Sequence, residues 1–196
     1  MSVVINRNLG ETHNGMLFQE NMLSKKVIMP INKVNINMKS ILEKYLNKNY
    51  TGKCFEEGYI EKNSVRVVSY TNGLCNANNL EFHVVFTCNI CIVSDSMMLE
   101  CKIENKNSSG IKCSVILDKA SINLEDVNED EHEDEHEDHN KTSDSLIIFC
   151  TRDHNNENKN FNDLEVGNNV VVKVIGSKYE LFDEYICVIG KFIKKI

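Results

Sequence analysis

The chain has 196 residues, a formal net charge of −7, 41% apolar and 26% charged residues, no tryptophan and a single proline. This composition is typical of a globular protein with one large or two small domains, and it excludes collagen-like and proline-rich classes. Ten acidic residues lie between Glu125 and Asp138, and without these ten the net charge becomes +3, so the rest of the chain is compatible with a nucleic-acid partner.

No membrane or export signal is visible. Residues 1–15 lack the apolar core of a signal peptide. The longest apolar uncharged run, residues 84–94, has about half of the ~20 residues that a membrane-spanning helix needs. We therefore expect a soluble, intracellular protein with no membrane partner.

The first part of the chain predicts a leader, a strand and a helix. Residues 1–24 show no periodicity and are predicted to be irregular. The short apolar run 26–31 contains Pro30, which suits an edge strand. A helix that ends within residues 47–52 is predicted from apolar residues at helical spacing, namely Met38, Ile41, Leu42, Tyr45 and Leu46.

From Lys53 onward the apolar residues recur with a period of two instead of the helical period. Residues 52–62, 64–70 and 81–93 are predicted to be strands, with a turn signal at Asn72-Gly73. A helix and an antiparallel sheet within residues 25–94 predict a first domain of α+β type.

Residues 95–196 predict a second domain. Apolar residues alternate with polar ones at 99–103 and 111–115, and further strand-like runs follow at 145–153, 165–179 and 184–193. Five short strands favour a small closed barrel of the OB type, because closure removes exposed strand edges. The predicted fold is therefore mostly β.

An acidic insert, residues 125–144, interrupts this second domain. Such a dense block of one charge repels itself and is predicted to be disordered. His132, His136 and His139 lie at i, i+4 and i+7, which would form a metal-binding face on a helix. We favour a solvated tract without metal.

The eight cysteines are interpreted as free thiols in a reducing compartment. Cys88 and Cys91 form a C-x-x-C pair, but no second pair follows to complete a zinc site. Cys101 and Cys113 fall on apolar alternation and are predicted core residues.

Three common catalytic motifs are absent from the sequence. The phosphate loop, the G-x-S-x-G elbow and H-E-x-x-H do not occur. Cys150 precedes His154 by four residues, but only Asp153 is near to orient the histidine. We therefore expect no catalytic residues and no enzyme activity of the chain on its own.

Three segments resemble the stalk subunit of multisubunit RNA polymerases, the family of the seventh subunit of eukaryotic RNA polymerase II and the archaeal E subunit. They are residues 25–60 (KKVIMPINKVNINMKSILEKYLNKNYTGKCFEEGYI), 81–116 (EFHVVFTCNICIVSDSMMLECKIENKNSSGIKCSVI) and 170–193 (VVVKVIGSKYELFDEYICVIGKFI). The chain departs from the family at residues 93–100, where VSDSMMLE replaces a basic-aromatic F-K/R-P-F-x-G-E segment. This divergence, with 27 asparagines, fits a large DNA virus of eukaryotes or a fast-evolving protist.

The resemblance implies a non-catalytic subunit with a polymerase-docking tip domain at 25–94 and an S1-type OB barrel at 95–196. It implies no cofactor, and as partners the other polymerase subunits, weakly bound nascent single-stranded RNA and a fourth-subunit-like protein. The location would be the nucleus for a cellular protein, or a cytoplasmic virus factory or virion for a viral one. The positions that match the docking tip are Gly58, Tyr59, Ile60, Asn72, Gly73 and Leu74.

The same resemblance singles out Lys112, Phe149 and Arg152 for RNA binding. S1-type barrels carry an outward aromatic residue just after the glycine of their second strand, and Lys112 stands at that place. Phe149 matches the ring position of the third strand and is either a stacking ring or a core aromatic, and Arg152 follows it. With one ring replaced by lysine, binding would depend on phosphate contacts and be weak, sequence-tolerant and salt-sensitive.

Three other functions stay open at this point. A free-standing S1-type RNA-binding protein, such as an exosome cap or a translation factor, is the main alternative. An acidic chaperone or metal buffer would be built around the insert. A cysteine hydrolase would use Cys150 and His154.

Overall fold

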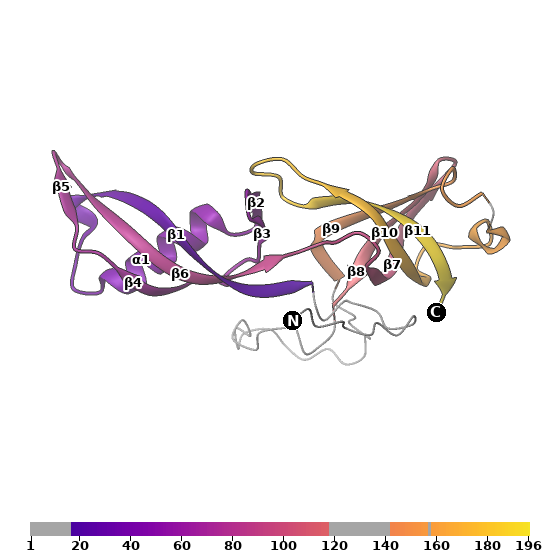
Figure 1. The fold of residues 1–196 in the computed structure, drawn as a ribbon, viewed down its shortest axis with the longest axis horizontal. Coiled ribbons are helices and arrows are strands. Elements are labelled where there is room, and N and C mark those ends of the chain that lie inside the picture. The colour runs from indigo at the N-terminus through magenta and orange to yellow at the C-terminus, as the bar shows by residue number, and fades with distance from the viewer. Residues whose placement is uncertain (1–16, 118–141, 157) are drawn as a thin grey trace, which may run out of the picture. The chain divides into compact units, whose positions relative to one another are not determined.

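The computed structural model describes residues 17–117, 142–156 and 158–196. The protein is mostly β, with 56% of these residues in strands and one α-helix among them. The chain divides into two compact units (Figure 1). The N-terminal unit contains Leu17–Ile92 together with Tyr179–Ile186, and the barrel unit contains Val93–Lys178 and Cys187–Ile196.

A sheet built around one long central strand forms the N-terminal unit. Its strands are β1 (Phe18–Pro30), β2 (Lys53–Phe55), β3 (Gly58–Ile60), β4 (Arg66–Tyr70), β5 (Leu74–Asn76) and β6 (Asn79–Cys91). The central strand β6 pairs antiparallel with β1 along its whole length. Its other edge carries β5, β4 and β3 one after another, and β2 extends the sheet beyond β3.

Strand β1 starts earlier than the edge strand predicted at 26–31. The ladder begins at the pair Phe18 and Cys91, so residues 18–24 belong to the sheet and not to an irregular leader. Val27 and Met29 are the fully buried residues of β1, and the polar residues before them hide the period of two. The remainder of the predicted leader, residues 1–16, lies outside the described residues.

Two turns also differ from the prediction. Residues 52–62 form the hairpin of β2 and β3 instead of one strand. Gly58 follows its turn with φ +131°, and a Cβ there would lie 2.9 Å from the carbonyl oxygen of Cys91, so the hairpin requires glycine. The tight turn into β6 is formed by Ala77 and Asn78, while Asn72-Gly73 lies in the connection between β4 and β5.

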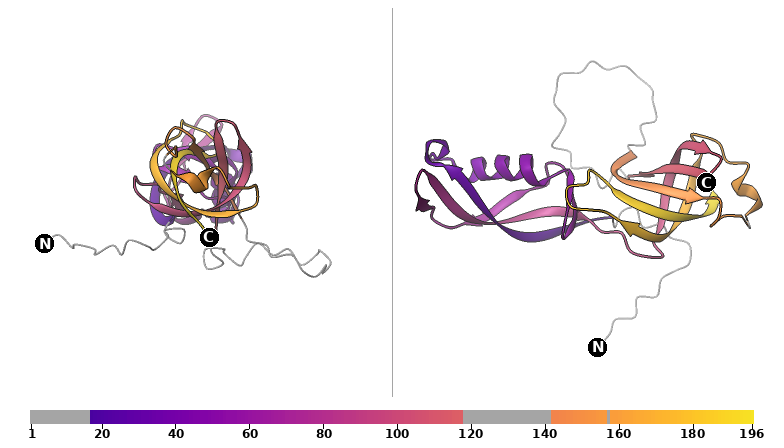
Figure 2. Two further views of the ribbon diagram at one scale, coloured as in Figure 1. Left: turned by 90° about the vertical axis from the view of Figure 1, so that its right-hand side faces the viewer. Right: turned by 90° about the horizontal axis from the view of Figure 1, so that it is seen from above.

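The predicted helix is confirmed as α1 (Met38–Tyr50), which ends within residues 47–52. Its buried face consists of Met38, Leu42 and Leu46, which belong to one core cluster with the sheet. In the right-hand view of Figure 2 the helix runs along one face of the sheet. Polar contacts fix it there, because Glu43 accepts a hydrogen bond of 2.9 Å from the backbone N–H of Val67.

The segment Tyr179–Ile186 connects two barrel strands but belongs to the N-terminal unit. Its backbone pairs with the edge of β2, where Cys54 donates to Asp183 O and Phe182 N–H donates to Cys54 O, both at 2.8 Å. The ring of Phe182 lies edge-on to Phe55, with 5.5 Å between the ring centres. The segment therefore covers the outer edge of the sheet.

The barrel unit contains the closed five-stranded barrel that the sequence predicts. Its strands are β7 (Met98–Asn107), β8 (Gly110–Ile116), β9 (Thr142–Thr151), β10 (Asn169–Lys178) and β11 (Ile186–Lys195). Around the ring they follow the order β7, β8, β9, β11, β10 and return to β7. Cys101 and Cys113 have no exposed surface, which confirms that they are core residues.

The acidic insert lies almost entirely outside the described residues. Strand β9 begins at Thr142, so the last three positions of the predicted insert 125–144 belong to a strand. The favoured interpretation of a solvated tract and the alternative of a metal-binding face at His132, His136 and His139 both concern residues that the structure does not describe. Within the described ranges, no three His, Cys, Asp or Glu side chains gather to hold a metal ion, and no helix has the length and apolarity to cross a membrane.

Candidate nucleic-acid interface

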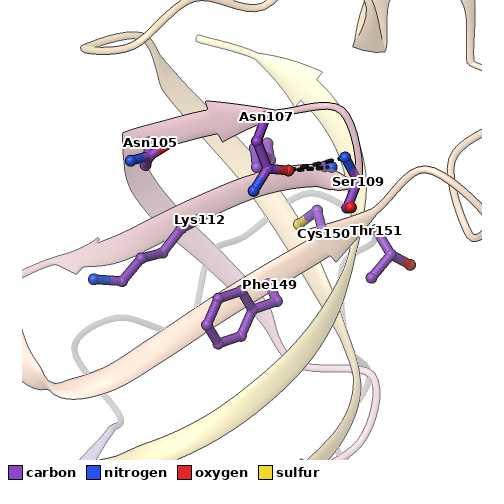
Figure 3. Close-up of a pocket in the computed structure, with 9 residues that line it drawn as sticks. Asn105, Asn107, Ser109, Lys112, Phe149, Cys150 and Thr151 are labelled. Atoms are coloured by element: carbon purple, nitrogen blue, oxygen red, sulfur yellow. Dashed lines mark hydrogen bonds between the residues drawn. The ribbon is translucent and has the colours of Figure 1, made fainter.

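A pocket of about 270 Å³ lies on the outer face of the barrel, where β7, β8 and β9 run side by side. Two rows of directly paired residues form it, Asn105–Lys112–Phe149 and Asn107–Gly110–Thr151 (Figure 3). Directly paired residues of a sheet point to the same face. The strand register therefore brings polar and aromatic side chains from three strands together.

Gly110 leaves the middle of the second row without a side chain. Its φ is +153°, and a Cβ there would overlap the carbonyl oxygen of Cys150 and lie 3.0 Å from the Cα of Thr151. Only glycine fits this close approach of β8 to β9. The hollow is thus a consequence of the backbone packing itself.

Phe149 lies on the outer face and not in the core. Its side chain is 37% exposed, whereas its neighbours Ile148 and Cys150 have no exposed surface. The alternation along β9 turns the ring toward the pocket. An exposed aromatic ring on a sheet offers a stacking surface to an unpaired base.

Lys112 lines the pocket but is not a free cation. Its Nζ lies 2.9 Å from Oε2 of Glu104, and both side chains are 39% exposed. The hydrogen bond from Lys112 lowers the pKa of Glu104 below its ordinary value of 4.5, so the carboxylate stays charged at neutral pH. Glu104 reaches this place because β7 has a register shift between Ile103 and Asn105.

Asn107 closes the turn between β7 and β8. Its Oδ1 accepts hydrogen bonds from the backbone N–H groups of Ser109 (2.9 Å) and Gly110 (3.0 Å). An amide nitrogen cannot accept hydrogen bonds, so these two contacts fix the orientation of the side chain. Figure 3 shows the amide nitrogen turned away from Ser109 and toward the side of Lys112 and Phe149.

Arg152 follows the end of β9 beside the same turn. Its backbone N–H donates to Ser109 O at 3.0 Å, and its side chain is exposed. Of the three positions predicted for RNA binding, Lys112 and Phe149 are cross-strand partners. Arg152 borders the turn but does not line the pocket.

The six positions predicted for docking fall into two separate groups. Gly58, Tyr59 and Ile60 form β3 and are buried, so their side chains belong to the core and are closed to a partner. Leu74 is 62% exposed in β5, with Asn72 and Gly73 just before it. The two groups pair with β6 nine residues apart, at positions 81 and 90, or about 30 Å along the strand.

The geometry of Cys150 does not suit a nucleophile. The thiol has no exposed surface, and its hydrogen bond with Cys113 together with burial raises its pKa far above the ordinary value. His154 is exposed and its Nδ1 lies 2.8 Å from Oγ1 of Thr151. Cys88 and Cys91 are likewise buried. Burial is the main reason why their pKa values rise to about 11 and about 12.

The sequence analysis did not identify Asn107, Gly110 or Glu104 as parts of the interface. The turn signal at residues 105–110 was available, and a two-residue turn there pairs Asn107 with Gly110 across the hairpin. The period of two then places Lys112 next to Gly110 on the outer face. The register shift that brings Glu104 to Lys112 leaves no such mark in the sequence.

No protein-family model matches this chain, and no curated protein matches it.

Proposed function

We propose that this chain is a non-catalytic stalk subunit of a multisubunit DNA-directed RNA polymerase. The N-terminal unit is the tip domain that docks on the polymerase core near the clamp, and the barrel is an S1-type OB domain that contacts nascent RNA. The sequence resemblance over residues 25–60, 81–116 and 170–193 supports this assignment, because its segments follow the order of the family. The division of the chain into two units is compatible with it.

The strand order of the barrel supports an OB domain. If β7 is counted as strand one, the order around the ring is one, two, three, five, four and back to one. This is the Greek-key order of the five-stranded OB barrel, in which the face of strands two and three binds oligonucleotides. In this chain that face is formed by β8 and β9, which carry Lys112 and Phe149.

The observation that carries the RNA contact is the exposed ring of Phe149 beside a cation. Base stacking on an aromatic side chain contributes about 1–3 kcal/mol per base and tolerates every sequence. Lys112 can add a phosphate contact once it leaves Glu104, at a cost that an exposed ion pair keeps small. The expected binding is weak and weakens further with salt.

The docking contact is supported by exposed apolar side chains at one end of the sheet. Leu74 and Ile28 are both cross-strand partners of Glu81, so they lie on the same face. They are 62% and 51% exposed. Large exposed apolar side chains that lie close together mark interaction surfaces, and Leu74 is one of the positions that match the docking tip.

Affinity purification tests the polymerase assignment. The tagged full-length chain should bring down the large polymerase subunits in equal amounts, and Leu74→Glu should lose them. Met22→Glu is the matched control, because Met22 is also 62% exposed but lies toward the opposite end of β1. A chain that arrives alone or with nuclease subunits would instead favour the free-standing RNA-binding protein.

Crosslinking to transcript tests the RNA contact separately. The double variant Lys112→Glu, Arg152→Glu should weaken crosslinking, and Phe149→Ala should lower RNA affinity about 5- to 150-fold, the equivalent of one stacked base. Ile175→Ala is the control, because it removes an exposed apolar side chain of β10 outside the pocket, and it should change crosslinking and RNA affinity little. Unchanged crosslinking in both test variants would remove this face from the RNA path.

A further inference from the structure

We propose that the pocket between β7 and β9 holds one unpaired base and prefers uracil, with Asn107 as the residue that selects it. This inference rests on the proposed RNA contact and adds a modest selectivity to binding that is otherwise sequence-tolerant. It follows from the size of the pocket and from the fixed orientation of one amide group.

The pocket has room for a single base. Its volume of about 270 Å³ falls below the range of roughly 300–1,000 Å³ for drug-sized ligands. Strands β7 and β9 lie about 10 Å apart across β8, and Gly110 between them leaves the space open. A base that lies over Gly110 can therefore contact the ring of Phe149 at one side and reach Asn107 at the other.

Asn107 presents a hydrogen-bond donor to that base. Its oxygen is held by the backbone N–H groups of Ser109 and Gly110, so its amide N–H groups are the ones available to a ligand. In the proposal the edge of the base that lies away from its sugar, at ring position 4, faces Asn107, where uracil carries a carbonyl oxygen and cytosine carries an amino group. A donor that faces an amino group gains no hydrogen bond and leaves two donors unsatisfied.

Two other polar groups of the pocket are already engaged. Nζ of Lys112 pairs with Glu104, and Oγ1 of Thr151 lies 2.8 Å from Nδ1 of His154. Asn105 and Ser109 also line the pocket. We assign the selection between pyrimidines of the same size to Asn107, because two backbone hydrogen bonds fix the orientation of its amide group.

Affinities of the full-length protein for eight-nucleotide oligo-U and oligo-C test the inference, measured by fluorescence anisotropy at low salt. The wild type should bind oligo-U about 2- to 10-fold more tightly, which is the range of one hydrogen bond. Asn107→Asp keeps an oxygen for the turn and replaces the donor by an acceptor that suits the cytosine amino group. The variant should therefore bind oligo-C more tightly than oligo-U.

The ratio of the two affinities separates base selection from the effect of charge, because the added negative charge weakens the binding of both oligonucleotides alike. Asn168→Asp is the matched control, since Asn168 also accepts a backbone hydrogen bond, from Glu165 at 3.1 Å, but lies outside the pocket. This control should keep the preference for oligo-U. The side-chain amide signals of Asn107 in ¹⁵N NMR spectra give a second readout on the wild type, and should shift more with uridine monophosphate than with cytidine monophosphate.

Each failure points to a different error. Equal wild-type affinity for both oligonucleotides, an unchanged ratio in Asn107→Asp, or equal amide shifts would overturn the uracil preference and leave the RNA contact standing. A wild-type protein that binds neither oligonucleotide would overturn the proposed RNA contact and the preference together.

Discussion

Neutralising Glu104 should strengthen RNA binding. In Glu104→Gln, Lys112 loses its partner at 2.9 Å and becomes available to a phosphate. A carboxylate about 6 Å from a bound phosphate repels it by about 0.7 kcal/mol at the dielectric constant of water, and by about 3 kcal/mol at an effective value of 20. Removal of this repulsion predicts RNA affinity about 3- to 100-fold higher than in the wild type.

Stability should change little in the same variant. Both side chains of the pair are 39% exposed, and pairs of this kind contribute less than about 1 kcal/mol. Fluorescence anisotropy with labelled oligo-U at several salt concentrations is the assay. The slope of log affinity against log salt should steepen by about 0.7, the contribution of one further phosphate contact in single strands.

A matched variant separates this local effect from net charge. Glu165→Gln makes the same charge change at an exposed position of the barrel unit outside the pocket, and its affinity should stay close to that of the wild type. If Glu104→Gln binds RNA no better than Glu165→Gln, the ion pair does not restrain Lys112 and the reasoning is wrong.

Four further predictions concern the fold. Gly110→Ala should lower the free energy of unfolding in urea by about 1–3 kcal/mol or more through backbone overlap, and clearly more than Gly176→Ala in β10, where a Cβ meets no atom within 4 Å; equal losses would contradict the close approach of β8 and β9. Leu42→Ala, at a helix position without exposed surface, should cost about 2–5 kcal/mol in the same assay, and a loss below 1 kcal/mol would place the helix outside the core. Iodoacetamide followed by mass spectrometry should label the exposed Cys75 in the native protein but not Cys88. Burial raises the pKa of Cys88 from 9.0 to about 11. The stability that the buried neutral thiol contributes is therefore present below pH 9 and is lost as the pH rises through 11. Urea midpoints that stay constant from pH 8 to 11 would refute this pH dependence.

Sequence patterns predicted the elements that have one apolar face. The stripe of Met38, Leu42 and Leu46 has helical spacing, and it marks the side of α1 that the core buries. Alternation in the barrel strands is equally clear at Cys101 and Cys113. In both cases burial on one face leaves a period that can be counted.

The register and the exposure of mixed segments could not be predicted in this way. Residues 146–150 are apolar throughout, so no period showed whether Phe149 faces the core or solvent. Six of the first nine residues of β1 are polar and none of these nine is buried, so long-range pairing with β6 rather than burial makes this segment a strand. Tyr59 and Ile60 were placed among the docking residues by the family resemblance, which carries no information on burial, and the sheet buries both.

The hydrogen bonds between Cys54 and the segment Tyr179–Ile186 have a practical consequence for dissecting the protein. A fragment that stops at Ile92 keeps all six strands of the first sheet but loses the chain that pairs with β2. The exposed backbone groups of β2 could then form hydrogen bonds with the same strand edge of a second molecule. Such a fragment is expected to self-associate, and adding a peptide of residues 179–186 should return it to the monomer.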